Sequence, residues 1–189
     1  MTGTKLSGLV VTGTALAADP SRTAALSAMT LARAAGALTV LDIDYRAYTW
    51  SDTGEAARIY VDAARAADII IGNDDEFGLL AGGHDQGSAL ARDLAQGALL
   101  SILKLGAAGS RTFTPDYSFV TPIFPVTALK PMGAGDGFMG GLLAGLAQGH
   151  TLQTSVRRGA ATAALIVAGI GCAPASPDTA TLDAFLARH

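Results

Sequence analysis

The sequence predicts an α/β fold in which a doubly wound, mostly parallel sheet carries helices on both faces. Short apolar runs alternate with longer amphipathic segments, which is the pattern of strands joined by crossover helices. Gly, Asn, Asp and Pro residues separate these segments and mark turns and helix ends. Half of the 189 residues are hydrophobic and 15% are charged, so the chain has ample apolar material for a buried core.

The elements follow one another without repeats, linkers or low-complexity tracts. Strands are expected at residues 6–12, 38–43, 68–72 and 98–105, with a β-hairpin or two short strands over 111–128. Helices are expected at residues 20–35, 54–66, 86–96, 133–147, 152–168 and 179–188, and directly after Asn73. Asp19 precedes Pro20, a favoured first helical residue, and Asn73 precedes three acidic residues that suit a helix start. Residues 1–189 are therefore expected to form a single α/β domain.

Composition excludes several classes of protein. The 13 Lys and Arg residues are scattered and the net charge is −3, which argues against a nucleic-acid partner. Cys172 is the only cysteine, so an internal disulfide and a cysteine metal cluster are excluded, as suits a reducing cytoplasm. Residues 1–18 and 159–175 resemble a signal peptide and a membrane span only weakly. We expect a cytoplasmic protein with no membrane partner; a secreted chain cleaved after Ala17 is the alternative.

The stretch Gly133-Ala134-Gly135-Asp136 is the most informative part of the sequence. Small residues at a helix start let backbone N–H groups approach and bind an anion. An aspartate there would repel a phosphate, but it can take the proton from a hydroxyl that attacks one. The same residues fit equally well a helix that Asp136 caps and that packs closely through its glycines. The sequence alone leaves both interpretations open.

Two other phosphate-binding motifs fit less well. A Walker A loop requires Gly-Lys followed by Ser or Thr, and none of the three lysines follows a glycine. Gly135-x-Gly137-x-x-Gly140 satisfies the dinucleotide-binding pattern literally. That pattern also requires a preceding strand and an acidic residue about twenty positions later. Lys130-Pro131-Met132 precede the motif and do not have the pattern of a strand, and no acidic residue lies between Asp136 and Asp178.

Three motifs, in their order along the chain, resemble those of the ribokinase-like (PfkB-type) sugar kinases. Asn73-Asp74-Asp75-Glu76 resembles the N-x-x-E element of that family. The stretch from Lys104 to Gly109 is similar to its strand-to-loop element near the nucleotide phosphates. Gly133 to Asp136 resembles its C-terminal signature. Each motif is unspecific by itself, but their joint occurrence on the expected elements is specific.

The resemblance implies a set of site residues. Asp136 would be the catalytic base, and the backbone of Gly133, Ala134 and Gly135 would form the anion hole. Asn73 and Glu76 would help hold the Mg²⁺ of Mg-ATP through water. The remaining phosphate-site residues implied by the resemblance are Lys104, Gly106 and Gly109.

Within the family the resemblance narrows to the 5-dehydro-2-deoxygluconate kinases of myo-inositol catabolism. It rests on residues 11–16 and 20–22, and on Leu41 to Arg46 with the aromatic residues that follow. Related 2-keto-3-deoxygluconate kinases and fructokinases carry an asparagine where this chain has Asp44. The resemblance implies that Asp44 and Arg46 contact a keto-deoxy sugar acid. From its chemistry alone, Arg46 suits a carboxylate or phosphate, or an exposed ion pair at a strand end.

The resemblance covers nearly the whole chain but only the later part of the family pattern. The glycine-rich sugar-binding segment and the β-sheet lid have no counterpart before Leu6. The chain is therefore expected to be the C-terminal nucleotide-binding part of a kinase that is truncated at its N-terminus. Its expected function is transfer of the γ-phosphoryl group of ATP to a hydroxyl of a sugar acid. The alternatives are an inactive nucleotide-binding remnant and a relative of the 2-keto-3-deoxygluconate kinases or fructokinases; the sequence does not decide between a monomer and a homo-oligomer.

Overall fold

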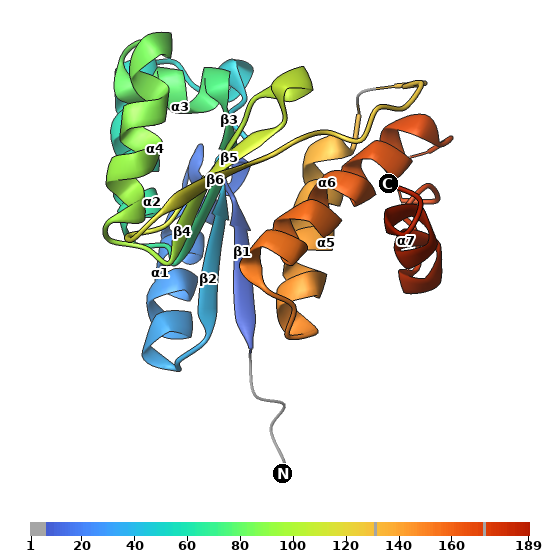
Figure 1. The fold of residues 1–189 in the computed structure, drawn as a ribbon. Helices are drawn as coiled ribbons and strands as arrows, with labels where there is room; N and C mark the ends of the chain where they lie inside the picture. Colours follow the sequence, from blue (N-terminus) through green and yellow to red (C-terminus); the bar gives the residue numbers. More distant parts are fainter. Residues whose placement is uncertain (1–6, 131, 172) are drawn as a thin grey trace. The chain divides into compact units, whose positions relative to one another are not determined.

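The chain begins with strands and helices in alternation. A computed structural model describes residues 7–130, 132–171 and 173–189 (Figure 1). The strands, in chain order, are β1 (Gly8–Thr12), β2 (Leu38–Asp42), β3 (Ile69–Asn73), β4 (Leu100–Lys104), β5 (Ser110–Phe113) and β6 (Ser118–Thr121). The helices among them are α1 (Ser21–Ala34), α2 (Thr53–Arg65), α3 (Asp74–Ala81) and α4 (Gly87–Ala95). Leu6 and Cys172, on which predictions fell, lie outside the described residues.

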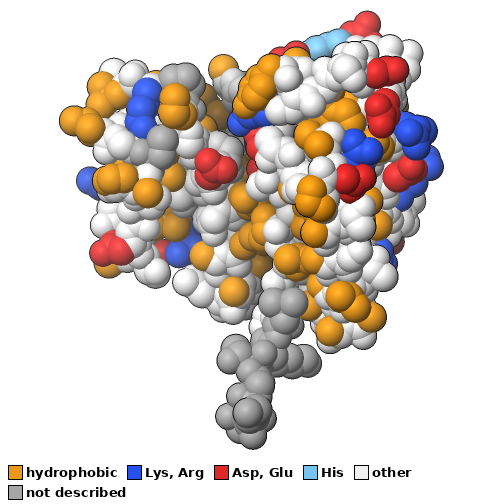
Figure 2. Space-filling model, turned by 180° about the vertical axis from the view of Figure 1, so that it is seen from behind, with side chains coloured by type: hydrophobic (Ala, Val, Ile, Leu, Met, Phe, Trp, Pro, Cys, Tyr) orange, Lys and Arg blue, Asp and Glu red, His pale blue; other side chains and the backbone are white. Residues whose placement is uncertain are grey.

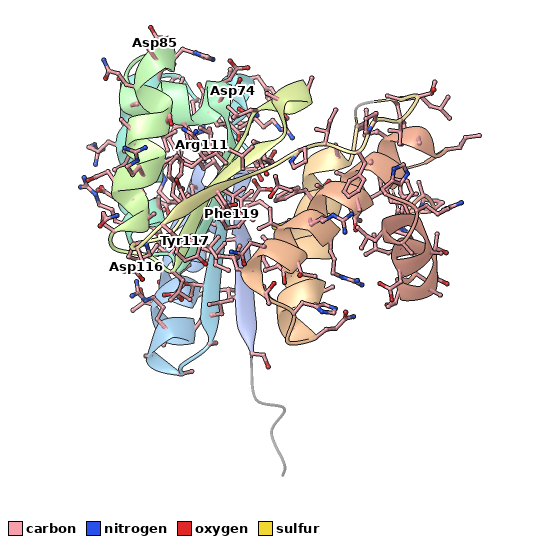
Figure 3. The ribbon with its side chains drawn as sticks, in the orientation of Figure 1. Asp74, Asp85, Arg111, Asp116, Tyr117 and Phe119 are labelled. Atoms are coloured by element: carbon pink, nitrogen blue, oxygen red, sulfur yellow. The ribbon has the colours of Figure 1, made fainter. Side chains whose placement is uncertain are left out.

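The sheet has six strands in sequence order and is mixed. β1 to β4 pair in parallel. The connections before and after β5 are too short for parallel crossovers, so β5 and β6 run antiparallel to their neighbours. The backbone N–H of Thr114 donates to the Tyr117 carbonyl at 2.9 Å and closes the hairpin, whose Tyr117 and Phe119 are labelled in Figure 3. The prediction of a mostly parallel sheet is confirmed.

The sequential strand order places the crossover helices together. Parallel crossovers have one hand, so three crossovers that advance in the same direction put α1 to α4 on one face of the sheet, as Figure 1 shows. The core of this part lies between that face and the helices. Its largest fully buried side chains include Leu41, Ile70, Tyr60, Phe77 and Phe113.

The chain divides into two compact units. The first unit comprises the described residues up to Gly106 together with Arg111–Phe119. The second comprises Ala107–Ser110 and the described residues from Val120 onward. The second unit contains α5 (Ala134–Ala147), α6 (Leu152–Ala168) and α7 (Thr179–Leu186). The expectation of a single domain stays a prediction.

The helices α5 and α6 of the second unit pack closely through glycines. A Cβ atom added to Gly141 would lie 2.8 Å from the carbonyl oxygen of Arg158. A Cβ atom added to Gly159 would lie 2.6 Å from the carbonyl oxygen of Phe138. Real Cβ atoms do not approach backbone atoms so closely, so both positions require glycine. Part of the glycine-rich run after residue 133 therefore serves helix packing. This was part of one of the two interpretations of the sequence.

Most predicted boundaries agree with the structure to within two residues. The structure makes Pro20, and not Asp19, the N-cap of α1, which begins at Ser21. The Oδ1 atom of Asp19 accepts bonds from the N–H and Oγ1 of Thr23, in the first turn of the helix, at 3.0 and 2.6 Å. These bonds lower the pKa of Asp19. The hairpin is shorter than predicted, since its second strand ends at Thr121 and prolines 122 and 125 follow.

Two surface properties bear on the excluded classes of protein. On the face shown in Figure 2, Lys and Arg side chains are dispersed among Asp and Glu side chains. A nucleic-acid binder would instead gather basic side chains into one patch or stripe. Within the described part of the chain, no helix combines the length and hydrophobicity needed to cross a bilayer.

Gly13 offers a test of the close packing beneath β1 and β2. A Cβ atom there would collide with the carbonyl oxygen of Ile43 and with the ring of Tyr60. We expect Gly13→Ala to lower the free energy of unfolding by about 3 kcal/mol, since overpacking against backbone cannot relax cheaply. Urea denaturation measures this loss. Gly97→Ala is the control, because Gly97 is exposed and the added Cβ would only touch a carbonyl at 4.0 Å. Equal stability of the two variants would contradict the packing described.

Tyr60 offers a test of core burial by pH. Desolvation raises its pKa to about 12, and the charges of Asp44 and Glu76 add to this effect. The unfolded chain releases this proton near pH 10 and the folded protein keeps it, so stability falls as the pH rises from 10 towards 12. Ultraviolet titration of phenolate should show one late component that Tyr60→Phe removes. The exposed Tyr48→Phe should leave that component in place, and titration of all tyrosines together near pH 10 would contradict the burial.

Candidate functional site

The carboxyl ends of the parallel strands bring together polar residues, of which Asn73 and Lys104 were predicted for the site. Asp42 ends β2, Asn73 ends β3 and Lys104 ends β4. The register pairs Asn73 with Lys104 directly and Asp42 with Ile71, two residues before Asn73. In open α/β sheets, ligands bind just beyond the carboxyl ends of the strands. These side chains therefore lie at the edge of the first unit where a ligand is expected.

A capping box forms the turn between β3 and α3. The Oδ1 atom of Asn73 accepts the backbone N–H of Glu76 at 2.8 Å, and Oε2 of Glu76 accepts the backbone N–H of Asn73 at 2.7 Å. Glu76 is only 9% exposed. Figure 3 labels Asp74, the first helical residue of this turn. The prediction that Asn73 caps a helix is confirmed, and the N-x-x-E motif has a structural task in this chain.

The loop after β2 carries the predicted substrate residues. Asp44 has a φ of 37°, in the left-handed region that Asp and Asn tolerate better than most residues. Its Oδ1 lies 2.6 Å from Nη2 of Arg46, whose side chain is 51% exposed. Between them, the backbone N–H of Tyr45 donates to Oε1 of Glu76 at 3.2 Å. The ion pair at a strand end, one of the two interpretations of Arg46, is therefore present.

Lys104 and the loop after β4 form the third predicted group. The Nζ atom of Lys104 lies 3.9 Å from Oδ1 of Asp42, and both side chains are largely buried. Gly106 and Gly109 have positive φ values of 54° and 88°. A Cβ atom on Gly109 would collide with the carbonyl oxygen of Thr121, whereas one on Gly106 would meet open space. The backbone thus requires glycine at position 109 whether or not a ligand binds.

The start of α5 presents free backbone donors and a free carboxylate. Gly133 is the N-cap with a φ of 87° and, being glycine, has no side chain with which to cap the helix. The first helical bond runs from the N–H of Gly137 to the carbonyl of Gly133 at 2.9 Å, so the amides of Ala134, Gly135 and Asp136 have no helical acceptor. Asp136 is exposed, and among the described residues no hydrogen bond or ion pair engages its carboxylate. The helix-cap interpretation of Asp136 is therefore wrong.

A cavity of about 410 Å³ opens beside Asp136 within the second unit. One wall is α5, from Gly133 to Gln148, and another is formed by residues 176–179 and Leu182. Its size falls within the range of sites for small molecules. Arg158 also lines it; this guanidinium is buried and donates to Oδ1 of Asp183 at 2.5 Å. The second unit therefore has accessible space next to the predicted base.

The structure groups the predicted residues by unit. In the first unit, contacts link Asp44 to Arg46, and Glu76 to Asn73 and the loop. Gly109 and residues 133–136 belong to the second unit.

The sequence did not point to Asp42 or Tyr45 as site residues. An acidic residue at a strand end was the only local signal for Asp42, and the partner of the Tyr45 amide has no sequence signal.

The donor atoms fit a hydrated metal ion better than one bound directly by protein. The described residues contain no group of three or more His, Cys, Asp or Glu residues that could hold a metal ion. Both carboxylate oxygens of Glu76 already accept backbone N–H groups. Mg²⁺ keeps several waters and often takes its other ligands from phosphates. Asn73 and Glu76 thus fit contact with such an ion through water.

Comparison with known sequences gives one family. The model of the pfkB family carbohydrate kinases matches residues 5–179. The chain is 40% identical over 184 residues to a 5-dehydro-2-deoxygluconokinase of Photobacterium profundum, covering 94% of the chain and 56% of that protein. It is 36% identical over 184 residues to the enzyme of the same name from Clostridium beijerinckii, covering 94% of the chain and 54% of that protein. The chain thus spans about half the length of these relatives.

Comparison with solved structures also finds kinases. A fructokinase from Vibrio cholerae O395, bound to fructose, ADP and calcium, superimposes with a TM-score of 0.87 at 28% identity, over 97% of this chain and 62% of the fructokinase. An aminoimidazole riboside kinase from Salmonella enterica, bound to aminoimidazole riboside and an ATP analogue, superimposes with a TM-score of 0.84 at 29% identity, over 94% of this chain and 61% of that kinase. The predicted ribokinase-like α/β fold is confirmed. Since the family model spans most of its length, the chain belongs to the pfkB family of carbohydrate kinases.

Proposed function

We propose that the chain is the nucleotide-binding part of an ATP-dependent kinase that acts on a keto-deoxy sugar acid such as 5-dehydro-2-deoxygluconate. The observation that carries this proposal is the start of α5, where amides without helical acceptors adjoin the exposed carboxylate of Asp136, which has no partner in the described part of the chain. The names of the relatives support the substrate class. The ADP and the ATP analogue in the related structures support the nucleotide. A cytoplasmic location is part of the proposal.

In the proposed reaction Asp136 is the base. The hydroxyl oxygen of the sugar acid attacks the γ-phosphorus of ATP while its proton passes to the Asp136 carboxylate. The new O–P bond forms as the bond between the γ-phosphorus and the bridging oxygen breaks, and ADP leaves with that electron pair. The N–H groups of Ala134 and Gly135 stabilise the charge on the transferred phosphoryl oxygens. They need no reorganisation, because the helix already holds them in place.

The remaining phosphate contacts are assigned to the first unit and to the loop after β4. Lys104 carries a positive charge that suits phosphate, and Gly106 can admit a phosphate close to the backbone because it has no side chain. When bound with ATP, Mg²⁺ neutralises charge on the β- and γ-phosphates. Asn73 and Glu76 would orient its water ligands. Arg46 would bind the carboxylate of the sugar acid with the part of its guanidinium that is exposed.

Nucleotide binding without phosphoryl transfer is the second candidate function. It is favoured by the limited overlap with the relatives, since the chain spans 54–56% of their length. Any catalytic contribution from their remaining part would be missing from this chain alone. Measurements of turnover and of nucleotide binding on the same sample separate the two candidates.

Asp136→Asn tests the proposed base. The amide keeps the size of the side chain but cannot accept the proton, so turnover should fall by roughly 100- to 10,000-fold. The affinity for Mg-ATP, measured by calorimetry, should stay nearly unchanged. Asp116→Asn is the control, because Asp116 lies in the exposed hairpin turn of the first unit. Unchanged turnover would refute the base assignment, and joint loss of binding and turnover would indicate a structural role.

Thermal unfolding with and without Mg-ATP tests the nucleotide site. Ligand at about 100 times its dissociation constant should add about 2.7 kcal/mol to the free energy of unfolding. This corresponds to a rise of a few degrees in Tm for a chain of this length. The rise should depend on magnesium. A cooperative transition that Mg-ATP leaves unmoved would contradict nucleotide binding, and with it both candidate functions.

A further inference from the structure

Glu76 connects two segments that are far apart in the sequence. Its Oε2 atom accepts the N–H of Asn73 at 2.7 Å, and its Oε1 atom accepts the N–H of Tyr45 at 3.2 Å, 31 residues away. Tyr45 lies directly between Asp44 and Arg46, which form the ion pair of the loop after β2. One buried carboxylate therefore holds both the β3–α3 turn and the centre of that loop.

The physical cost of releasing this loop is high. A carboxylate that is 9% exposed has lost most of its water, so each N–H group that it accepts replaces a lost hydrogen bond. Hydrogen bonds to an ionised acceptor are stronger than neutral ones. If the Tyr45 N–H turned away, Oε1 would be left without this partner. The direction of the Tyr45 amide is therefore set by Glu76.

The far end of the loop is held by aromatic packing. The half-buried Trp50 ring packs against Tyr60, with centroids 5.7 Å apart, and the Arg22 guanidinium lies over it at 5.3 Å. The Tyr45 ring meets Tyr60 edge-on at 6.1 Å. Tyr60 is completely buried and belongs to α2. The carbonyl of Arg46 also accepts the N–H and Oγ1 of Thr49, at 3.0 and 2.7 Å. Within this frame, the Glu76 contact holds the backbone of Tyr45, midway between Asp44 and Arg46.

We propose that Glu76 is a positioning residue, which holds the Asp44–Arg46 pair for the sugar acid through the Tyr45 N–H and couples this loop to the turn at Asn73. The part that concerns the sugar acid rests on the proposed function; the part that concerns loop placement does not. A ligand that contacts the turn changes the loop through the same carboxylate. The coupling is reciprocal. The factor by which bound Mg-ATP changes the affinity for the sugar acid equals the factor by which bound sugar acid changes the affinity for Mg-ATP.

Glu76→Gln against Asp75→Asn is the decisive pair of variants. The glutamine amide keeps one acceptor oxygen and cannot hold both backbone N–H groups, whereas Asp75 is an exposed neighbour in the same helical turn whose loss changes the charge equally. We expect amide exchange over residues 43–50 to rise about tenfold in Glu76→Gln, the effect of one lost bond to a charged group. Exchange in α4 and β4 should stay unchanged. Equal exchange in both variants, or a uniform rise throughout the protein, overturns the proposal.

The wild-type protein provides a test that does not depend on the folding of a variant. The chain has four tyrosines, so selective ¹⁵N-tyrosine labelling gives few amide signals, and Tyr45→Phe identifies that of Tyr45. The Tyr45 amide should be protected from exchange, unlike that of Tyr48, whose side chain is 87% exposed. An unprotected Tyr45 amide overturns the proposal.

The single tryptophan reports on the functional part of the proposal. Trp50 is the only tryptophan of the chain and lies at the end of this loop, so its fluorescence can follow titration with 5-dehydro-2-deoxygluconate. The dissociation constant should rise about tenfold in Glu76→Gln and stay unchanged in Asp75→Asn. An equal affinity in Glu76→Gln overturns the positioning role. A wild-type protein that does not respond to the sugar acid refutes the proposed substrate, while the exchange measurements still decide the loop contact.

Discussion

The parallel alignment of β1 to β4 is the constraint on which the candidate site of the first unit depends. Because these strands run in one direction, Asp42, Asn73 and Lys104 all emerge at the same edge of the sheet. A register shift of one residue would turn every side chain of a strand to the opposite face. Burial of Leu41 and Ile70 against the helices prevents such a shift. Apolar packing therefore determines where the polar residues of the site lie.

At this edge the polar residues are already engaged with one another. Lys104 faces Asp42, Arg46 is paired with Asp44, and both oxygens of Glu76 accept backbone N–H groups. Asp136 differs, because its carboxylate is exposed at a helix start and has no partner among the described residues. The engaged residues are preorganised, which suits the binding and positioning of a ligand. The carboxylate of Asp136 has no partner among the described residues, which suits a group that takes up a proton.

The glycine-rich run of α5 combines two requirements that look alike in the sequence. At Gly133 the backbone takes a positive φ, and the amides that follow have no helical acceptor. At Gly141 the helix meets the backbone of α6 so closely that a side chain would clash. Neither requirement can be separated from the other by composition, because both select the absence of a Cβ atom. The contacts of each position are needed to assign its role.

The sequence by itself determined the elements whose signals are local. The helix at residues 152–168, the cap at Asn73 and the parallel strands were predicted because turn residues, caps and apolar periodicity act over a few residues. Only the tertiary structure decided which polar groups meet. Tyr45 and Glu76 are separated by 31 residues, and the Asp42–Lys104 contact joins two strands with a third between them. Such contacts follow from strand order and register, which arise from packing of the whole core and leave no pattern in either segment alone.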